Sequence, residues 1–120
     1  MTVIYQTTIT RIGQSAPDAL CDKMMITFRE GAPADIEEFC FIHSHGELNG
    51  SLQAGIQFEL GQHNYPVTAV GSVAERNLRE LGHITLRFDG LSEAEFPGTV
   101  HVAGPVPDGI EPGCILKFIV

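Results

Sequence analysis

The sequence contains no tryptophan, only seven Lys and Arg residues against fifteen Asp and Glu, and no apolar run as long as a membrane span. The formal net charge of −8 disfavours nucleic acid as a partner, because binding would require basic side chains to neutralise phosphates. Neither a transmembrane helix of about 20 apolar residues nor a charged and then apolar secretory signal is present. We therefore expect a cytoplasmic protein that binds no nucleic acid and does not insert into a membrane.

Motifs for several common chemistries are also missing. The three cysteines, Cys21, Cys40 and Cys114, have no CxxC spacing, which disfavours a disulfide framework or a structural zinc site. The nucleotide-binding patterns G-x-x-x-x-G-K-[ST] and G-x-G-x-x-G are absent, as is the G-x-S-x-G elbow of serine hydrolases. We expect neither a cofactor nor a metal.

An internal repeat organises the chain. Thr10–Leu20 reappears as Thr68–Leu78 with the shared pattern T-x-[IV]-G-x-x-A-x-x-x-L, and His43 corresponds to His101 at the same offset of 58 residues. The chain has 120 residues, enough for one compact domain that buries about two-thirds of its unfolded surface. We interpret residues 1–120 as a single domain made of two similar halves, about 5–60 and 63–118.

Short β-branched and alternating segments, separated by Gly, Pro and Asp, predict an all-β fold. The expected strands are 2–12, 24–28, 39–45, 56–60, 66–70, 84–88, 99–103 and 115–119. Short helices are expected near 15–22, capped by Ser15, and near 73–81, capped by Ser72 and ended by Gly82; residues 31–38 should form a loop or a single helical turn. The predicted architecture is a duplicated, pseudo-twofold β-barrel or sandwich with one or two short helices.

The predicted strand 39–45 carries the densest group of chemically active side chains. Strand side chains alternate, so His43, His45 and Glu47 should lie on one face at its exposed end. A neutral imidazole on a rigid strand is a suitable nucleophile near pH 7. We assume attack through Nε2, with the Nδ1 proton held by a neighbour.

Other interpretations of these histidines remain open. His43 and His45 are also compatible with a purely structural role. The run from His43 to Glu47 and the run from Pro97 to His101 are similar to the two metal-binding motifs of cupins, although their spacings differ from that pattern. A cupin-like metal-binding or small sugar-binding β-domain is therefore the alternative function.

Three separated blocks point to a known family. These are Phe41-Ile42-His43, the segment from Tyr65 through Ala74 with Asn77-Leu78 and Leu81-Gly82-His83, and Phe96-Pro97-Gly98-Thr99-Val100-His101. Together they resemble the glucitol/sorbitol-specific IIA component of the bacterial phosphoenolpyruvate-dependent phosphotransferase system, across essentially the whole chain.

This resemblance implies a function. His43 would accept a phosphoryl group from phospho-HPr, forming a phosphohistidine intermediate, and pass it to the IIB part of the IIB/IIC membrane transporter for sugar uptake. The protein would thus be a phosphotransferase component. His45 is a candidate stabiliser of the phosphoryl group, and His101 is a candidate second-site partner if the pseudo-symmetry brings the strand ends together. An acidic rim for partner docking is expected at Asp35, Glu37, Glu38 and Glu47.

Overall fold

The structure is a computed structural model that describes residues 1–120. It contains eight strands and three short helices. In chain order these are β1 (Val3–Ile12), α1 (Ala16–Leu20), β2 (Met24–Arg29), α2 (Ala34–Glu37), β3 (Phe41–His43), β4 (Gln57–Leu60), β5 (His63–Val70), α3 (Ala74–Leu81), β6 (Thr85–Arg87), β7 (Thr99–Val102) and β8 (Ile115–Ile119).

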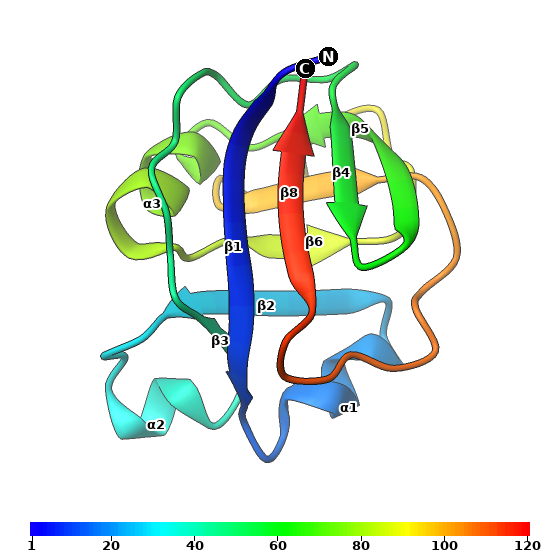
Figure 1. Cartoon of the computed structure of the whole chain (residues 1–120). Helices are drawn as coiled ribbons and strands as arrows, with labels where there is room; N and C mark the ends of the chain where they lie inside the picture. The colour runs from blue at the N-terminus through cyan, green and yellow to red at the C-terminus, as the bar shows by residue number, and fades with distance from the viewer.

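The strands close into a barrel in the order β1-β3-β2-β6-β7-β5-β4-β8, which confirms the predicted all-β class. In Figure 1, β1, β8 and β4 run side by side at the front, and β2 and β6 cross behind them at a large angle. The two termini meet at the top, where Thr2 and Val120 exchange backbone hydrogen bonds of 3.0 and 2.8 Å. A closed barrel leaves no long unpaired edge.

The second half of the barrel repeats the first, as the sequence predicts. Apart from α2, which has no counterpart in the second half, the order β1-α1-β2-β3-β4 recurs as β5-α3-β6-β7-β8. The pairing registers correspond as well: Arg29 lies opposite His43 in the parallel pair β2–β3, and Arg87 lies opposite His101 in β6–β7. The halves are interleaved, because β1 pairs with β8 and β5 pairs with β4. The two halves therefore share one core.

That core is a single cluster of 22 buried residues. Phe58 is fully buried in this cluster, with its ring 5.2 Å from that of Phe118 and 5.9 Å from that of Tyr65, measured between centroids. Aromatic side chains bury large apolar areas and so contribute strongly to the stability of the barrel. The barrel holds β3, which carries His43, between β1 and β2.

The helices lie where the sequence predicts them but differ from the prediction in capping. The segment 31–38, predicted as a loop or a single helical turn, contains the one-turn helix α2. Neither Ser15 nor Ser72 caps a helix through its side chain. The Ser15 hydroxyl instead donates to Glu38 Oε2 at 3.0 Å, and the amide of Val73 at the start of α3 is satisfied by the Pro97 carbonyl. None of the three helices has the length and hydrophobicity that a membrane-spanning helix needs.

The end of α3 agrees with the prediction. Gly82 follows the helix in the left-handed conformation, with φ 60° and ψ 25°. This conformation is strained for residues with a Cβ atom, and glycine is the usual residue at such a helix end. Its amide donates to the Leu78 carbonyl at 3.0 Å. The turn leads from α3 into β6 and places the Gly82 carbonyl beside the His43 ring.

Candidate functional site

His43 is the last residue of β3, but it is not at an exposed strand end. Its side chain is 1% exposed, so the expectation of a freely accessible imidazole is wrong for this conformation. The reason is that β3 is only three residues long and is buried on both faces. It pairs with β1 on one side and with β2 on the other, and the end of α3 lies over the ring.

Three hydrogen bonds determine the protonation of the His43 ring. Nε2 lies 2.8 Å from the Gly82 carbonyl oxygen, which can only accept a hydrogen bond. The backbone N–H of His45 donates to Nδ1 at 3.1 Å, and Thr7 Oγ1 lies 3.0 Å from the same nitrogen. The proton therefore resides on Nε2 and the lone pair on Nδ1. This is the reverse of the tautomer assumed from the sequence.

The surroundings of His43 favour the uncharged ring. Burial lowers the pKa of the imidazole below its ordinary value of 6.5, and the nearby His45 lowers it further. The hydrogen bond to Gly82 and the Glu30 carboxylate oppose this shift without reversing it. Because only the neutral form has a free lone pair, His43 is held in the protonation state that a nucleophile requires.

His45 lies beside His43 for a reason other than strand alternation. The predicted strand 39–45 ends at His43, and His45 has φ 67°, a conformation uncommon for residues other than glycine. The turn places the two imidazole centroids 5.8 Å apart. Tyr5 donates its hydroxyl to His45 Nδ1 at 2.8 Å, and His45 Nε2 donates to the Arg79 carbonyl at 3.1 Å. His45 is only partly buried, so it is the more accessible imidazole.

Both histidines therefore donate to carbonyls at the C-terminal end of α3. The last four carbonyls of a helix have no partner within the helix, and His43 and His45 satisfy those of Gly82 and Arg79. The contact at Gly82 is close: a Cβ atom there would lie 2.5 Å from His43 Cε1 and 2.8 Å from Nε2. The end of α3 thus covers the His43 ring, and glycine is required at the contact.

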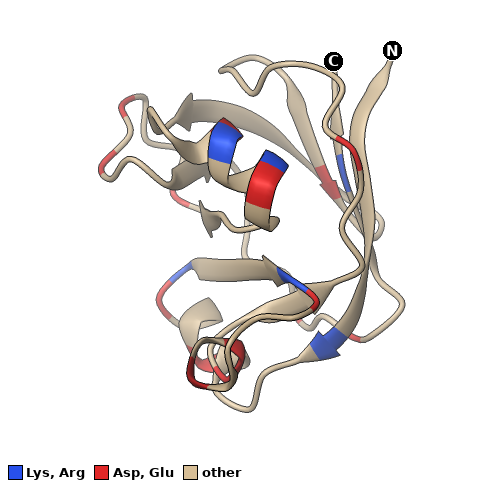
Figure 2. Cartoon of the chain, turned by 90° about the vertical axis from the view of Figure 1, so that its left-hand side faces the viewer, with Lys and Arg blue, Asp and Glu red and all other residues tan.

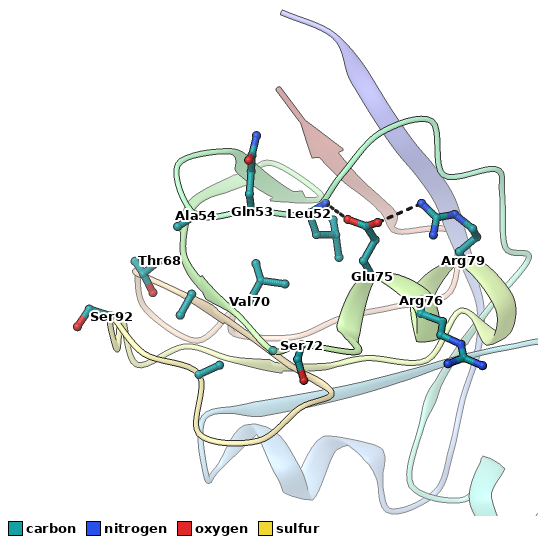
Figure 3. Close-up of a pocket in the computed structure, with 13 residues that line it drawn as sticks. Leu52, Gln53, Ala54, Thr68, Val70, Ser72, Glu75, Arg76, Arg79 and Ser92 are labelled. Carbon is teal, nitrogen blue, oxygen red and sulfur yellow. Dashed lines mark hydrogen bonds and ion pairs between the residues drawn. The ribbon is translucent and has the colours of Figure 1, made fainter.

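A second contact holds the chain between β3 and β4, residues 44–56, against α3. Glu75 accepts the backbone N–H of Leu52 through Oε1 at 2.8 Å and binds Arg79 through Oε2 at 3.3 Å. Figure 3 shows Glu75 between these two partners, at one side of a surface pocket of about 560 Å³. Arg76 also lines this pocket, which is therefore bounded by two arginines of α3.

The charges around His43 differ from the predicted acidic rim. Asp35 and Glu37 lie on α2, and Glu38 follows it, at the opposite end of β3 from His43; Glu37 pairs with Arg11. Glu47 is exposed and makes no hydrogen bond or ion pair with either histidine. Figure 2 shows this side of the molecule, with acidic residues around α2 and residues of both signs on α3.

Arg29 is the basic side chain nearest to His43 in the sheet. It lies opposite His43 in the β2–β3 register, and its Cβ would be 3.1 Å from a Cβ placed on Gly82. It forms no salt bridge, whereas Arg76 and Arg79 pair with Glu80 and Glu75. Its exposed guanidinium is therefore available for an anion close to His43.

His101 does not meet His43. The two lie at opposite ends of the four-stranded segment β3-β2-β6-β7, and strand spacing and rise place their Cα atoms about 20 Å apart. His101 Nδ1 donates to Asp89 Oδ1 at 2.7 Å, and Nε2 accepts the Glu95 amide at 3.2 Å. Both ring nitrogens are thus occupied, so a second-site role alongside His43 is not supported within one chain.

The sequence prediction also missed residues that complete the site. Thr7 and Tyr5 lie in a strand whose pattern indicates only β structure, and their contacts with His43 and His45 depend on the pairing of β1 with β3. Gly82 was identified only as a helix stop. No group of three or more His, Cys, Asp or Glu side chains is arranged to hold a metal ion.

Comparisons with known proteins agree with this architecture. Residues 4–117 match the family described as the PTS system glucitol/sorbitol-specific IIA component. Relatives of that description from Shigella flexneri and Escherichia coli (strain K12) are each 81% identical over 118 residues, covering 98% of this chain and 96% of theirs. The crystal structure of a PTS system IIA component from Enterococcus faecalis V583 has a TM-score of 0.87 and 31% identity, covering 96% of this chain and 99% of that one. The resemblance inferred from the sequence is confirmed.

Proposed function

The chain belongs to the glucitol/sorbitol-specific IIA family of the phosphotransferase system (PTS), and from that membership we propose that it carries a phosphoryl group on His43. His43 accepts the group from phospho-HPr and transfers it to the IIB component. The IIB/IIC transporter then couples it to the uptake and phosphorylation of glucitol. In this role the protein acts in the cytoplasm as a phosphotransferase component with a phosphohistidine intermediate.

The observation that carries this proposal is the environment of the His43 ring. Burial lowers its pKa, so the ring is neutral at pH 7, and three hydrogen bonds fix its orientation. Phosphoryl transfer between imidazoles needs little beyond in-line positioning, exclusion of water and stabilisation of the phosphoryl oxygens. A neutral imidazole that is held in a fixed orientation and shielded from water meets the needs for positioning and for exclusion of water.

The buried ring must become accessible before transfer. Its Nδ1 edge faces β1, a ten-residue barrel strand, whereas its Nε2 edge faces the end of α3 at Gly82. Helix ends open locally at a lower free-energy cost than central barrel strands. We therefore assign Nε2 as the attacking atom, exposed when the Gly82 carbonyl moves away as the partner docks.

In the phosphoryl-transfer step one phosphorus–nitrogen bond forms and one breaks. When the Gly82 carbonyl moves away, Nε2 loses its proton and Nδ1 takes one up, so that the ring stays neutral and the lone pair lies on Nε2. This lone pair attacks phosphorus, and the phosphorus–nitrogen bond of phospho-HPr breaks with its electron pair returning to the HPr imidazole. The reverse sequence delivers the group to IIB. We assign to Arg29 the neutralisation of the phosphoryl oxygens, because it lies opposite His43 in the β2–β3 register and forms no salt bridge, unlike Arg76 and Arg79. His45 stabilises the same oxygens once its Nε2–H leaves the Arg79 carbonyl.

Labelled phosphoenolpyruvate tests this assignment. The chain is incubated with the general transfer enzyme and HPr, and acid-labile, base-stable label is measured on wild type, His43→Gln and His45→Gln. His63→Gln is the matched control, because His63 is an exposed histidine on another strand. We expect His43→Gln alone to lose the label and His45→Gln to be labelled more slowly.

Two results would contradict the proposal. Label retained by a folded His43→Gln variant would remove His43 as the acceptor, and its simultaneous loss from His45→Gln would transfer that role to the more accessible ring. A stoichiometric transition metal in the purified protein would instead favour the cupin-like alternative.

A further inference from the structure

Thr7 carries a buried hydroxyl at the centre of the site. It is 3% exposed, and its Oγ1 lies 3.0 Å from His43 Nδ1 and 3.4 Å from Ser44 Oγ. The equivalent residue of the second half is Tyr65, whose hydroxyl donates to the Pro105 carbonyl and contacts no histidine. The hydroxyl of Thr7 therefore serves an arrangement that only the first half of the barrel contains.

The observed tautomer of His43 is not the reactive one for attack through Nε2. The proton lies on Nε2, and Nδ1 accepts the His45 amide. For Nε2 to attack, it must release this proton and Nδ1 must take one up. A backbone N–H can only donate, so the His45 amide cannot accept a hydrogen bond from a protonated Nδ1.

Of the groups that contact Nδ1, only the Thr7 hydroxyl can either donate or accept. We propose that Thr7 is a positioning residue that reverses the tautomer of His43: its hydroxyl donates to Nδ1 in the closed protein and accepts Nδ1–H when Nε2 attacks phosphorus. The inference rests on the proposed function, and it assigns to Thr7 a role in the phosphoryl-transfer step.

The proton transfers balance without another reactant. When the Gly82 carbonyl withdraws, Nε2 releases its proton to solvent and Nδ1 takes one up, so the ring stays neutral. The Thr7 hydroxyl then turns its own proton toward Ser44 Oγ, 3.4 Å away. Ser44 is exposed, so its hydroxyl can in turn bond to water. Thr7 and Ser44 thereby link the buried Nδ1 to solvent.

The test compares Thr7→Val, which keeps the shape but removes the hydroxyl, with Thr7→Ser, which keeps the hydroxyl. Thr10→Val is the matched control, because Thr10 is an exposed threonine of the same strand. The initial rate of labelling by phospho-HPr is measured, and ¹⁵N NMR of the ring nitrogens reports the tautomer of His43. Thermal unfolding confirms that each variant is folded.

We expect Thr7→Val to be labelled at least about tenfold more slowly, with Thr7→Ser and Thr10→Val within about threefold of wild type. Before phosphorylation, Thr7→Val should keep its proton on Nε2, because the His45 amide still donates to Nδ1. In the phosphorylated wild type, Nδ1 should carry a proton that exchanges slowly with water, and this proton should exchange faster in Thr7→Val.

Wild-type labelling of His43 with an unchanged rate in Thr7→Val would overturn the inference and leave the proposed function intact. An equal slowing in Thr7→Ser would also overturn it, because shape and not the hydroxyl would then matter. If wild-type His43 acquires no label, the proposed function fails, and the assigned role of Thr7 fails with it.

Discussion

Replacing Gly82 by alanine tests the packing of the end of α3 on the His43 imidazole. The new Cβ would lie 2.5 Å from His43 Cε1 and 2.8 Å from Nε2, closer than nonbonded carbon and nitrogen atoms can approach. The neighbouring Arg29 Cβ, at 3.1 Å, closes another side of the space. The ring must therefore move, and its hydrogen bond to the Gly82 carbonyl must break or lengthen.

Two costs contribute to the expected loss of stability. Alanine in the left-handed conformation at φ 60° costs about 1–2 kcal/mol. Leaving the buried Nε2–H of His43 without its partner costs about 1–3 kcal/mol more. The free energy of unfolding should fall by about 2–5 kcal/mol in total. For a chain of this length, each kcal/mol lowers Tm by about 4 °C.

Gly61 offers a matched control. It also has φ 60°, but a Cβ there would meet only Cys114 Sγ, at an ordinary contact distance of 3.5 Å. Gly61→Ala should therefore show the backbone cost alone, about 1–2 kcal/mol. Chemical denaturation of wild type and both variants measures the difference, and NMR of the His43 ring nitrogens shows whether the Nε2–H hydrogen bond is lost in Gly82→Ala.

Equal destabilisation of the two alanine variants would refute the reasoning. In that case the His43 ring could not be packed against Gly82, and the end of α3 would not be the cover of the site. An unchanged His43 spectrum in Gly82→Ala would lead to the same conclusion.

Three further predictions concern stability. Because burial lowers the folded-state pKa of His43 below 6.5, the unfolded chain binds more protons than the folded chain just below that pH. The free energy of unfolding of the wild type should therefore decrease as pH falls from about 6.5, and denaturation at several pH values should show a smaller decrease for His43→Gln. Glu75→Ala should cost about 1–2 kcal/mol and speed amide exchange in residues 44–56, whereas Glu80→Ala, which breaks only an exposed pair, should cost less than about 0.5 kcal/mol in the same measurements. Burial acts to raise the pKa of Asp89, but hydrogen bonds, foremost that from His101, hold it below 3.8. The stability that the ionised Asp89 gives the folded protein should therefore be lost as pH falls below about 3.8, and acid denaturation should show a smaller loss of stability for Asp89→Asn.

Much of the fold was predictable because it depends on local patterns and on a repeat. β-branched alternation identifies strands such as β1 and β8, and Gly82 correctly ends α3. The offset between His43 and His101 correctly predicts equivalent positions in β3 and β7. Helix capping was less predictable, because the Ser15 hydroxyl donates to the Glu38 carboxylate and the Val73 amide donates to the Pro97 carbonyl, and no local pattern contains these distant partners.

The site was predictable in part. Its residue types and its two histidines could be named, but their surroundings could not. Alternation placed His43 and His45 on one face, whereas a left-handed residue at His45 actually brings the rings together. The expected meeting of His43 with His101 failed because the antiparallel pairing of β2 with β6 sends the two strand ends in opposite directions.

The amino-acid sequence by itself determined the β class, the duplication and the family, since these depend on patterns within the chain and on resemblance between chains. Only the tertiary structure decided that the His43 ring is buried, that its proton lies on Nε2, and that Thr7 and Gly82 are its partners. These properties arise from contacts of His43 with residues that are 36 and 39 positions away in the sequence. Only barrel closure and the packing of α3 bring these residues within hydrogen-bond distance.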